Sequence, residues 1–138
     1  MTACKPGAFE LIKFKAHVIV SLDTAERIAY MLIIKHVPAP DYTYYKRHTR
    51  RKIASIFRAG YACIRMKTRI RQVVLMRYFM FWFCRNVLKY SLQKTGVTYG
   101  LLDHTSVLHG LNIVNDIMTL KYESGEKIAL MEFVKLVG

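Results

Sequence analysis

The chain has 138 residues and a hydrophobic content of 53%, which suit one globular domain and exclude an intrinsically disordered protein. Its 22 Lys and Arg against 9 Asp and Glu give a formal net charge of +13. This excess predicts a polyanionic partner, with nucleic acid ahead of an anionic membrane. Between Asp41 and Asp103 there are fourteen Lys and Arg and no Asp or Glu, so this segment predicts a folded surface that meets phosphates.

Cysteine usage and apolar runs narrow the class of protein further. Cys4, Cys63 and Cys84 form no CxxC pair and are odd in number, so buried reduced thiols are expected rather than a zinc site or a disulfide framework. The apolar run Tyr78 to Cys84 is too short to span a bilayer, and no secretory signal is visible. A cytoplasmic location is therefore expected.

Residues 1–40 are expected to form an arm with a separate role. Ile12 to Val20 alternate between apolar and other residues, which is typical of a half-buried strand, and a strand exchanged between protomers would make a homodimer. Ser21 to Val37 then predict a helix, with Asp23 as the N-cap and Glu26 at the capping-box position. The prolines of "PAPDY" end this helix and mark the clearest boundary in the chain.

Residues 41–120 are predicted to form a helical unit. Tyr42 to Ala59 have the pattern of a basic amphipathic helix, which Gly60 ends. After the basic stretch "MKTRIR", a helix from Gln72 to about Lys89 is apolar nearly all round and belongs at the centre of a small bundle. Its aromatic residues are expected in the core, with stacking on single-stranded bases as the alternative. They are Phe79, Phe81, Trp82 and Phe83.

The two segments that follow have the pattern of a helix-turn-helix. Ser91 is the expected N-cap of a short helix that Gly100 closes, and Asp103 is the expected N-cap of the next helix. In such a motif the second helix lies in the major groove, and its first residues meet base edges. Residues 121–138 form a tail, for which a final helix is predicted and a strand is the alternative. The fold class is therefore mainly α, a small helical bundle with a possible short N-terminal strand.

The stretch "RIRQVVLMRYFMFWFCRNVLKYSLQKTGVTYGLLDHTSVLHG" resembles domain IV, the C-terminal DNA-binding domain of the bacterial replication initiator DnaA, which has a Trp repressor-like helix-turn-helix. That family has an Arg-rich loop, a central helix with an Arg near its start, "SL..IG..FG" and then "RDHTTVLHA". The resemblance extends without gaps over about Ile53 to Met118.

The resemblance implies a set of residues that contact DNA. They are Lys67, Arg69 and Arg71 in the basic loop, Arg77 and Arg85 on the central helix, and Asp103, His104, Thr105 and Ser106 at the start of the recognition helix. Among them, Arg69 stands where the family enters the minor groove. His109 matches a second family His and is expected to be structural.

The chain departs from the family pattern at a few positions. Leu101 and Leu102 stand where the family has Gly and Arg, and Tyr78 stands where it has Gln. Gln93 and Thr95 replace the usual Pro and Ile. Because Leu102 removes a charged contact, the sequence specificity is expected to differ from that of the family.

The predicted function is sequence-directed binding of double-stranded DNA by a stand-alone DnaA-like helix-turn-helix, in replication control or transcriptional regulation. No G-x-x-x-x-G-K-[ST] motif occurs, so no ATPase is expected, nor any other enzyme activity, cofactor or metal. Replication proteins are further candidate partners, and the host is a bacterium, a phage or a mobile element. Two alternatives remain: an anionic-membrane-surface protein and a protein-interaction module that keeps the helix-turn-helix shell.

Overall fold

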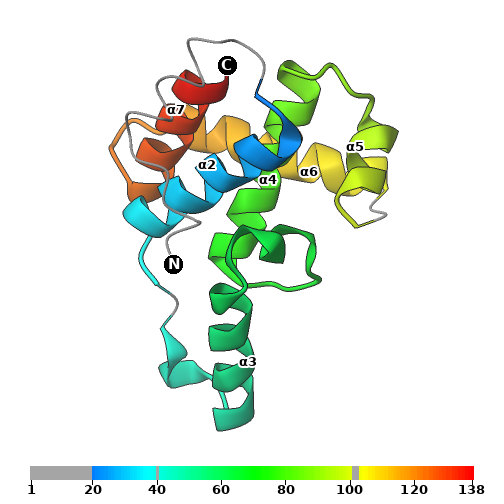
Figure 1. Cartoon of the computed structure of the whole chain (residues 1–138). Coiled ribbons are helices and arrows are strands. Elements are labelled where there is room, and N and C mark those ends of the chain that lie inside the picture. Colours follow the sequence, from blue (N-terminus) through cyan, green and yellow to red (C-terminus); the bar gives the residue numbers. More distant parts are fainter. Residues whose placement is uncertain (1–19, 40, 101–102) are drawn as a thin grey trace.

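The computed structural model describes residues 20–39, 41–100 and 103–138, so the predicted strand at residues 12–20 lies, except for Val20, outside the described part. The described residues fold into helices joined by short connections, without a strand (Figure 1). The elements are α2 (Leu22–His36), η1 (Tyr42–Tyr44), α3 (Arg47–Arg58), η2 (Gly60–Arg65), α4 (Arg71–Asn86), α5 (Leu92–Thr98), α6 (His104–Met118) and α7 (Gly125–Val137). The mainly α prediction is confirmed.

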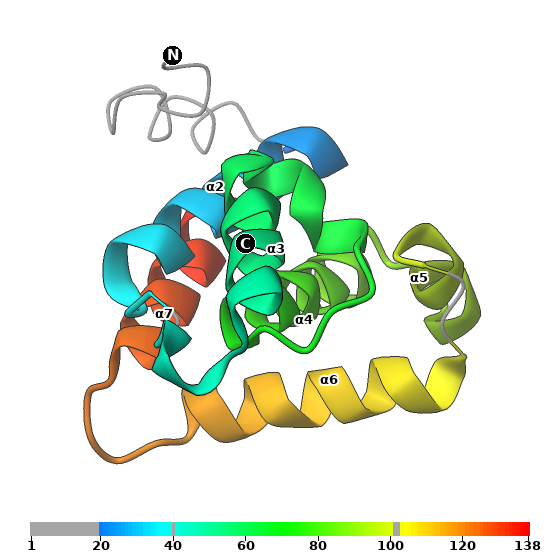
Figure 2. The ribbon, with the colours of Figure 1, turned by 90° about the horizontal axis from the view of Figure 1, so that it is seen from below.

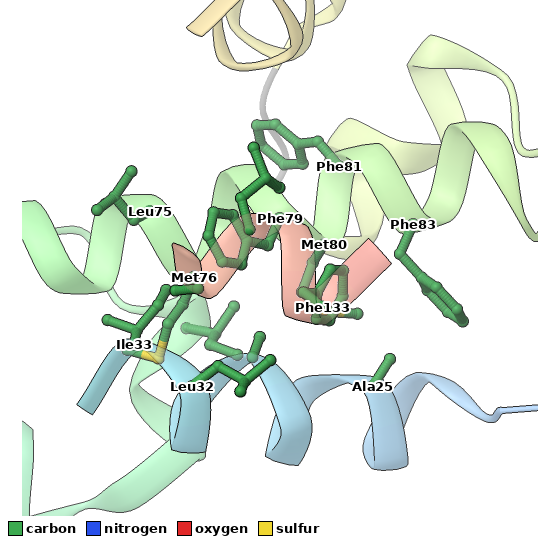
Figure 3. Close-up of a cluster of buried hydrophobic side chains, with 14 of the residues drawn as sticks. Ala25, Leu32, Ile33, Leu75, Met76, Phe79, Met80, Phe81, Phe83 and Phe133 are labelled. Carbon is green, nitrogen blue, oxygen red and sulfur yellow. The ribbon is translucent and has the colours of Figure 1, made fainter. Parts of the chain in front are cut away.

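Helix α4 lies at the centre of the bundle and packs against α2, α5, α6 and α7 (Figure 1). Phe79, Phe81 and Phe83 on this helix have no exposed surface, and Trp82 is partly buried. Phe133 of α7 meets Phe79 with ring centroids 5.4 Å apart, inside the apolar cluster of Figure 3. The core interpretation of the aromatic run is therefore confirmed, because these rings face other helices rather than solvent.

Helices α2 and α7 belong to the same hydrophobic core as α4. Ala25 and Ile33 of α2 and Leu130 of α7 are fully buried, and α2 packs against both α7 and α4. The predicted final helix is confirmed as α7, and the alternative of a C-terminal strand is wrong. The described parts of the expected arm and tail thus form one body with the helices between them.

The start of α2 differs from the prediction. Its N-cap is Ser21, whose Oγ accepts a hydrogen bond from the Thr24 N–H at 3.3 Å. Asp23 lies instead in the first turn, where its carboxylate is 3.5 Å from Arg27. Glu26 is buried and does not cap the helix. Ser21 takes the cap because its backbone is extended, with φ −69° and ψ 163°, while Asp23 is already helical.

The helix predicted for residues 42–59 divides into η1 and α3. Asp41 accepts hydrogen bonds from the N–H and the hydroxyl of Thr43, at 3.0 and 2.8 Å, and so closes a short turn. Tyr45 and Lys46 are extended, and α3 begins only at Arg47. Local side-chain bonding to the backbone thus competes with a continuous helix. The predicted stop at Gly60 fits its φ of 71°, a conformation that favours glycine.

Candidate nucleic-acid interface

Helices α5 and α6 form the predicted helix-turn-helix. Ser91 caps α5, with its Oγ accepting the Lys94 N–H at 3.1 Å, and Thr95 and Gly96 are buried. Gly100 has φ 107°, so the chain reverses at a position where a side chain would be strained. The connection between α5 and α6 covers residues 99–103.

Asp103 is the N-cap of α6, as predicted. Its carboxylate accepts the Ser106 N–H at 2.9 Å. This hydrogen bond holds the pKa of Asp103 below its usual value, so the carboxylate is charged at neutral pH and matches the positive end of the helix dipole. The cap fixes where the first turn of α6 begins.

The other polar residues of this first turn are available to a partner. His104, Thr105 and Ser106 are exposed, whereas Val107, which follows them, is fully buried. A surface hollow of about 490 Å³ lies between the start of α6 and α4. It is lined by Arg77, Tyr78, Phe81, Asp103, Thr105, Ser106 and His109. His104 faces α5 instead, where it lines a second hollow with Gln93 and Val97.

The basic loop lies between η2 and α4. Lys67 and Arg69 are both exposed on it. Between them, Thr68 accepts the Ile70 N–H with its hydroxyl at 3.3 Å, which fixes the local turn of the backbone. The two cations therefore point outward from an ordered segment.

Arg77 supports this loop from α4. Its Nε donates to the Ile64 carbonyl at 3.1 Å, and its Nη2 donates to the Met66 carbonyl. Burial lowers the pKa of Arg77, although an arginine remains charged at any ordinary pH. The side chain predicted to contact DNA thus also holds the start of the basic loop, while it lines the hollow beside Thr105.

Arg71, which was predicted in the basic loop, is the first residue of α4, and both Arg71 and Arg85 bind within the chain. Arg71 makes two parallel hydrogen bonds to the Glu126 carboxylate of α7, at 2.9 and 2.7 Å. Arg85 donates to the Tyr90 carbonyl at 2.7 Å and lines a hollow near Asn115 of α6. The structure therefore brings Arg77 to the start of α6, whereas Arg85 lies along the later turns of that helix.

A partly buried ion pair that the sequence did not reveal joins three elements. Arg65, at the end of η2, has its Nη2 2.8 Å from Glu26 of α2, and its guanidinium lies 5.0 Å from the centroid of the Tyr99 ring. The Glu26 side chain is only 3% exposed, and this burial raises its pKa while Arg65 opposes the rise. The pair connects α2, the start of the basic loop and the turn of the helix-turn-helix.

Gly110 sets how closely α6 approaches α4. A Cβ atom at this position would lie 2.6 Å from the ring of Tyr78 and 2.7 Å from that of Phe81. Gly110 stands where the family pattern has Ala, and Tyr78 stands where it has Gln. These two departures from the family pattern are therefore in contact. His109 packs edge-on against Tyr78, with ring centroids 6.2 Å apart.

The described residues also bear on the cysteines, on membrane-spanning helices and on metal sites. Cys63 and Cys84 are buried free thiols, as predicted, and burial raises the pKa of Cys63 to about 11. No described helix has both the length and the hydropathy needed to cross a membrane. No group of three His, Cys, Asp or Glu side chains suited to a metal ion is found in the described ranges.

Comparison with known proteins covers this part of the chain. Over 85 residues, which are 62% of the chain, the sequence is 28% identical to the chromosomal replication initiator protein DnaA of Lactobacillus acidophilus and 27% identical to that of Lactobacillus helveticus. The chain spans only 18% of the length of these curated relatives. No solved structure matches it. Residues 49–114, from α3 into α6, match the family described as "Bacterial dnaA protein helix-turn-helix", so the resemblance predicted from the sequence is confirmed.

Proposed function

We propose that the protein binds double-stranded DNA, with the start of α6 in the major groove and the basic loop against the neighbouring backbone and minor groove. The observation that carries the proposal is the exposed first turn of α6, capped by Asp103 and beside Arg77, within a segment that matches a DnaA helix-turn-helix. Small polar side chains at a helix start can approach base edges closely.

The residues of the interface have different roles in this proposal. His104 and Thr105 meet bases, and Ser106 meets a base or a phosphate. Lys67 and Arg69 supply charge to the backbone, with Arg69 in the minor groove. The remaining arginines, Arg71, Arg77 and Arg85, contact phosphates with guanidinium N–H groups beyond those bonded within the chain, because each guanidinium carries five.

In this proposal residues 41–120 supply the DNA contacts on a core that α2 and α7 complete, and the protein acts without an ATPase in replication control or transcriptional regulation. Such a protein would occupy the bacterial nucleoid or serve a phage or mobile element. Residues 1–40 are a candidate dimerisation arm, and replication proteins are candidate partners.

The protein-interaction alternative has one observation in its favour. Val97 on α5 is 55% exposed and Leu108 on α6 is 42% exposed, so each helix of the motif presents an apolar side chain to solvent. A partner protein would cover these two side chains. Substituting Arg for Leu102 separates the alternatives, since an added cation should raise duplex affinity in a DNA reader and leave protein docking without a specific gain.

Fluorescence anisotropy tests the proposal directly. The purified protein is titrated onto a duplex with a DnaA box, onto a scrambled duplex and onto anionic vesicles, each across a salt series. Tighter binding to the box is expected, with an affinity that falls as salt rises. Equal binding to both duplexes would remove the sequence-directed part of the proposal. Binding to vesicles alone would overturn it in favour of a membrane-surface protein.

A further inference from the structure

Helix α3 projects from the bundle and packs mainly against η2 (Figure 1). All the cations on and next to this helix are exposed. They are Lys46, Arg47, Arg50, Arg51, Lys52 and Arg58. Only Ile53 of this helix is buried. The element thus combines little packing of its own with the densest positive charge in the described chain.

The charge pattern of α3 opposes the stability of the helix itself. Arg47 occupies the first turn, where the helix dipole disfavours a cation, and no acidic residue lies there. The N-cap, Lys46, makes no side-chain cap hydrogen bond. Arg47 and Arg51 are also like charges four residues apart, which repel each other. A sequence that breaks several local rules together indicates a requirement other than folding.

Helical spacing gathers three of these cations on one face. Arg47, Arg51 and Arg58 are separated by four and seven residues, so they share a stripe that lies opposite Ile53 and Ile56. The stripe is about 16 Å long at 1.5 Å per residue. A duplex of that length contains about five base pairs, since base pairs repeat every 3.4 Å. The stripe can therefore follow several phosphates of one strand.

The apolar side of α3 favours a duplex over a lipid surface as the partner of this stripe. Ile53 is 4% exposed, and Ile56 and Phe57 pack against the core. Helices that bind membrane surfaces need an uncovered apolar face to insert between lipids. None of the large exposed apolar residues in the described chain lies between Arg47 and Arg58. Helix α3 therefore presents charge without an uncovered apolar face, which suits the phosphates of a duplex better than insertion into a bilayer.

Helix α3 leads through η2 into the basic loop of the proposed interface. In Figure 2 the segment from residues 66 to 70, which carries the basic loop, crosses between α3 and α6. No Asp or Glu interrupts the chain from α3 through this loop to the start of α6, where Asp103 is used as a cap. The cations of α3 thus extend the positive surface beyond the helix-turn-helix.

We propose that α3 is a second duplex-contacting element, in which Arg47, Arg51 and Arg58 bind backbone phosphates outside the segment that α6 reads. The inference rests on the proposed DNA binding and adds a longer footprint to it. These arginines strengthen binding to every sequence and do not contribute to the choice among sequences, because phosphates carry no sequence information.

The test compares a triple variant, Arg47→Gln with Arg51→Gln and Arg58→Gln, with the unchanged protein. The salt slope of duplex affinity should fall by about 2.7 for three lost contacts, and the affinity by on the order of tenfold to a hundredfold. The preference for a box over a scrambled duplex should be unchanged. Trimming the duplex to the box should weaken the unchanged protein and leave the variant nearly unaffected.

Two further variants make the test specific. Substituting Lys at the same three positions should keep most of the salt slope, since an ammonium still pairs with a phosphate. A matched control, Lys35→Gln with Lys121→Gln and Lys135→Gln, removes the same charge from exposed positions on α2, on the connection after α6 and on α7, and should leave the slope unchanged. Circular dichroism and thermal unfolding show whether each variant is folded.

The outcomes separate the two proposals. If the unchanged protein binds no duplex, the proposed function fails and the role of α3 fails with it. If the protein prefers its box but the Gln variant keeps the full slope and the dependence on duplex length, only the α3 proposal is overturned. Loss of vesicle binding in the Gln variant, with duplex binding unchanged, would reassign the stripe to lipid.

Discussion

Helices α4 and α6 both carry residues that are predicted to contact DNA, but these residues differ in whether they also bond within the chain. At the start of α6, the side chains of His104, Thr105 and Ser106 are exposed. On α4 every predicted contact residue is also bonded within the chain. Arg71 binds Glu126, Arg77 binds the Ile64 and Met66 carbonyls, and Arg85 binds the Tyr90 carbonyl. The arginines of α4 thus shape the surface, while α6 presents its side chains to a partner.

Because of this difference, the number of Lys and Arg in a segment does not equal the number available to bind DNA. The acid-free segment supplies fourteen Lys and Arg, yet several of them stabilise the fold. Arg65 is a further case, because it lies over Tyr99 and pairs with the buried Glu26. We therefore expect substitutions of the arginines that bond within the chain to change mainly the stability of the fold. Substitutions at the exposed start of α6 should change mainly the preference among DNA sequences.

The largest effect on stability is expected for Arg65→Ala. Breaking a buried ion pair costs about 3–5 kcal/mol, but the Arg65 side chain is 46% exposed, so we expect a loss of about 2 kcal/mol at pH 7. Urea unfolding measures it. Arg58→Ala, on an exposed residue that precedes η2, is the control and should change stability little.

The same variant has an expected pH dependence. Burial already raises the pKa of Glu26 above 4.5, and removal of Arg65 raises it further. A carboxyl whose pKa is raised in the folded state destabilises the fold as the pH increases from its ordinary pKa to the raised one, because over that interval the unfolded chain ionises while the folded chain keeps the proton. The loss should therefore shrink as the pH is lowered from 7 toward 4.5. An equal loss across this range would show that Glu26 does not respond to Arg65.

The next effect concerns base reading by α6. Thr105→Ala and His104→Ala should each cost about 1–3 kcal/mol at the preferred site and little on a scrambled duplex. Competition anisotropy with both duplexes measures the difference. Thr119→Ala, past the far end of the same helix, serves as the control. Equal losses on both duplexes would make these residues phosphate contacts or structural residues.

A smaller effect is expected where α6 meets α4. Gly110→Ala gains about 1 kcal/mol of helix propensity but costs about 1–3 kcal/mol through overpacking against Tyr78 and Phe81, so a net loss of about 1 kcal/mol is expected. Combining it with Tyr78→Gln should relieve the contact. A double-mutant cycle from urea unfolding should therefore give a coupling of about 1 kcal/mol, and additive effects would contradict the proposed dependence of one position on the other.

The smallest effect is a gain in DNA affinity. Glu126→Gln removes a negative charge beside the proposed phosphate contact of Arg71, so the affinity should rise a few-fold and the salt slope should increase by up to about one. Arg69→Ala should change the slope by about one in the opposite direction. Glu132→Gln is the matched control, because Glu132 lies 3.3 Å from His36 rather than beside a predicted contact residue. An unchanged affinity in Glu126→Gln would mean that Arg71 and Glu126 lie away from the bound duplex.

The sequence predicts those parts of the fold that depend on neighbouring residues. Ser91 and Asp103 cap the helices for which they were predicted, and Gly60 and Gly100 have the positive φ that a chain reversal requires. The start of α2 was predicted at Asp23 instead of Ser21, because both residue types serve as caps and lie two positions apart.

Contacts between distant residues were beyond such local patterns. Arg71 and Glu126 are 55 residues apart in sequence, and no spacing rule connects them. Glu26 has the capping-box position in sequence, but its burial depends on Arg65 and on the packing of α2. For the site, residue types and a family resemblance predicted which side chains face outward on α6. They did not predict which arginines also bind within the chain.

Because α2 and α7 complete the core, the segment that matches the family and the segment that folds do not coincide. A fragment of residues 49–114 would leave Phe79 and Phe83 without the helices that cover them, since Phe133 of α7 packs against both rings. It would also lose Glu26 and Glu126, the carboxylates that hold Arg65 and Arg71. DNA-binding assays on such an excised fragment would therefore report on an aggregation-prone chain, and the two flanking helices must be kept for any measurement of recognition.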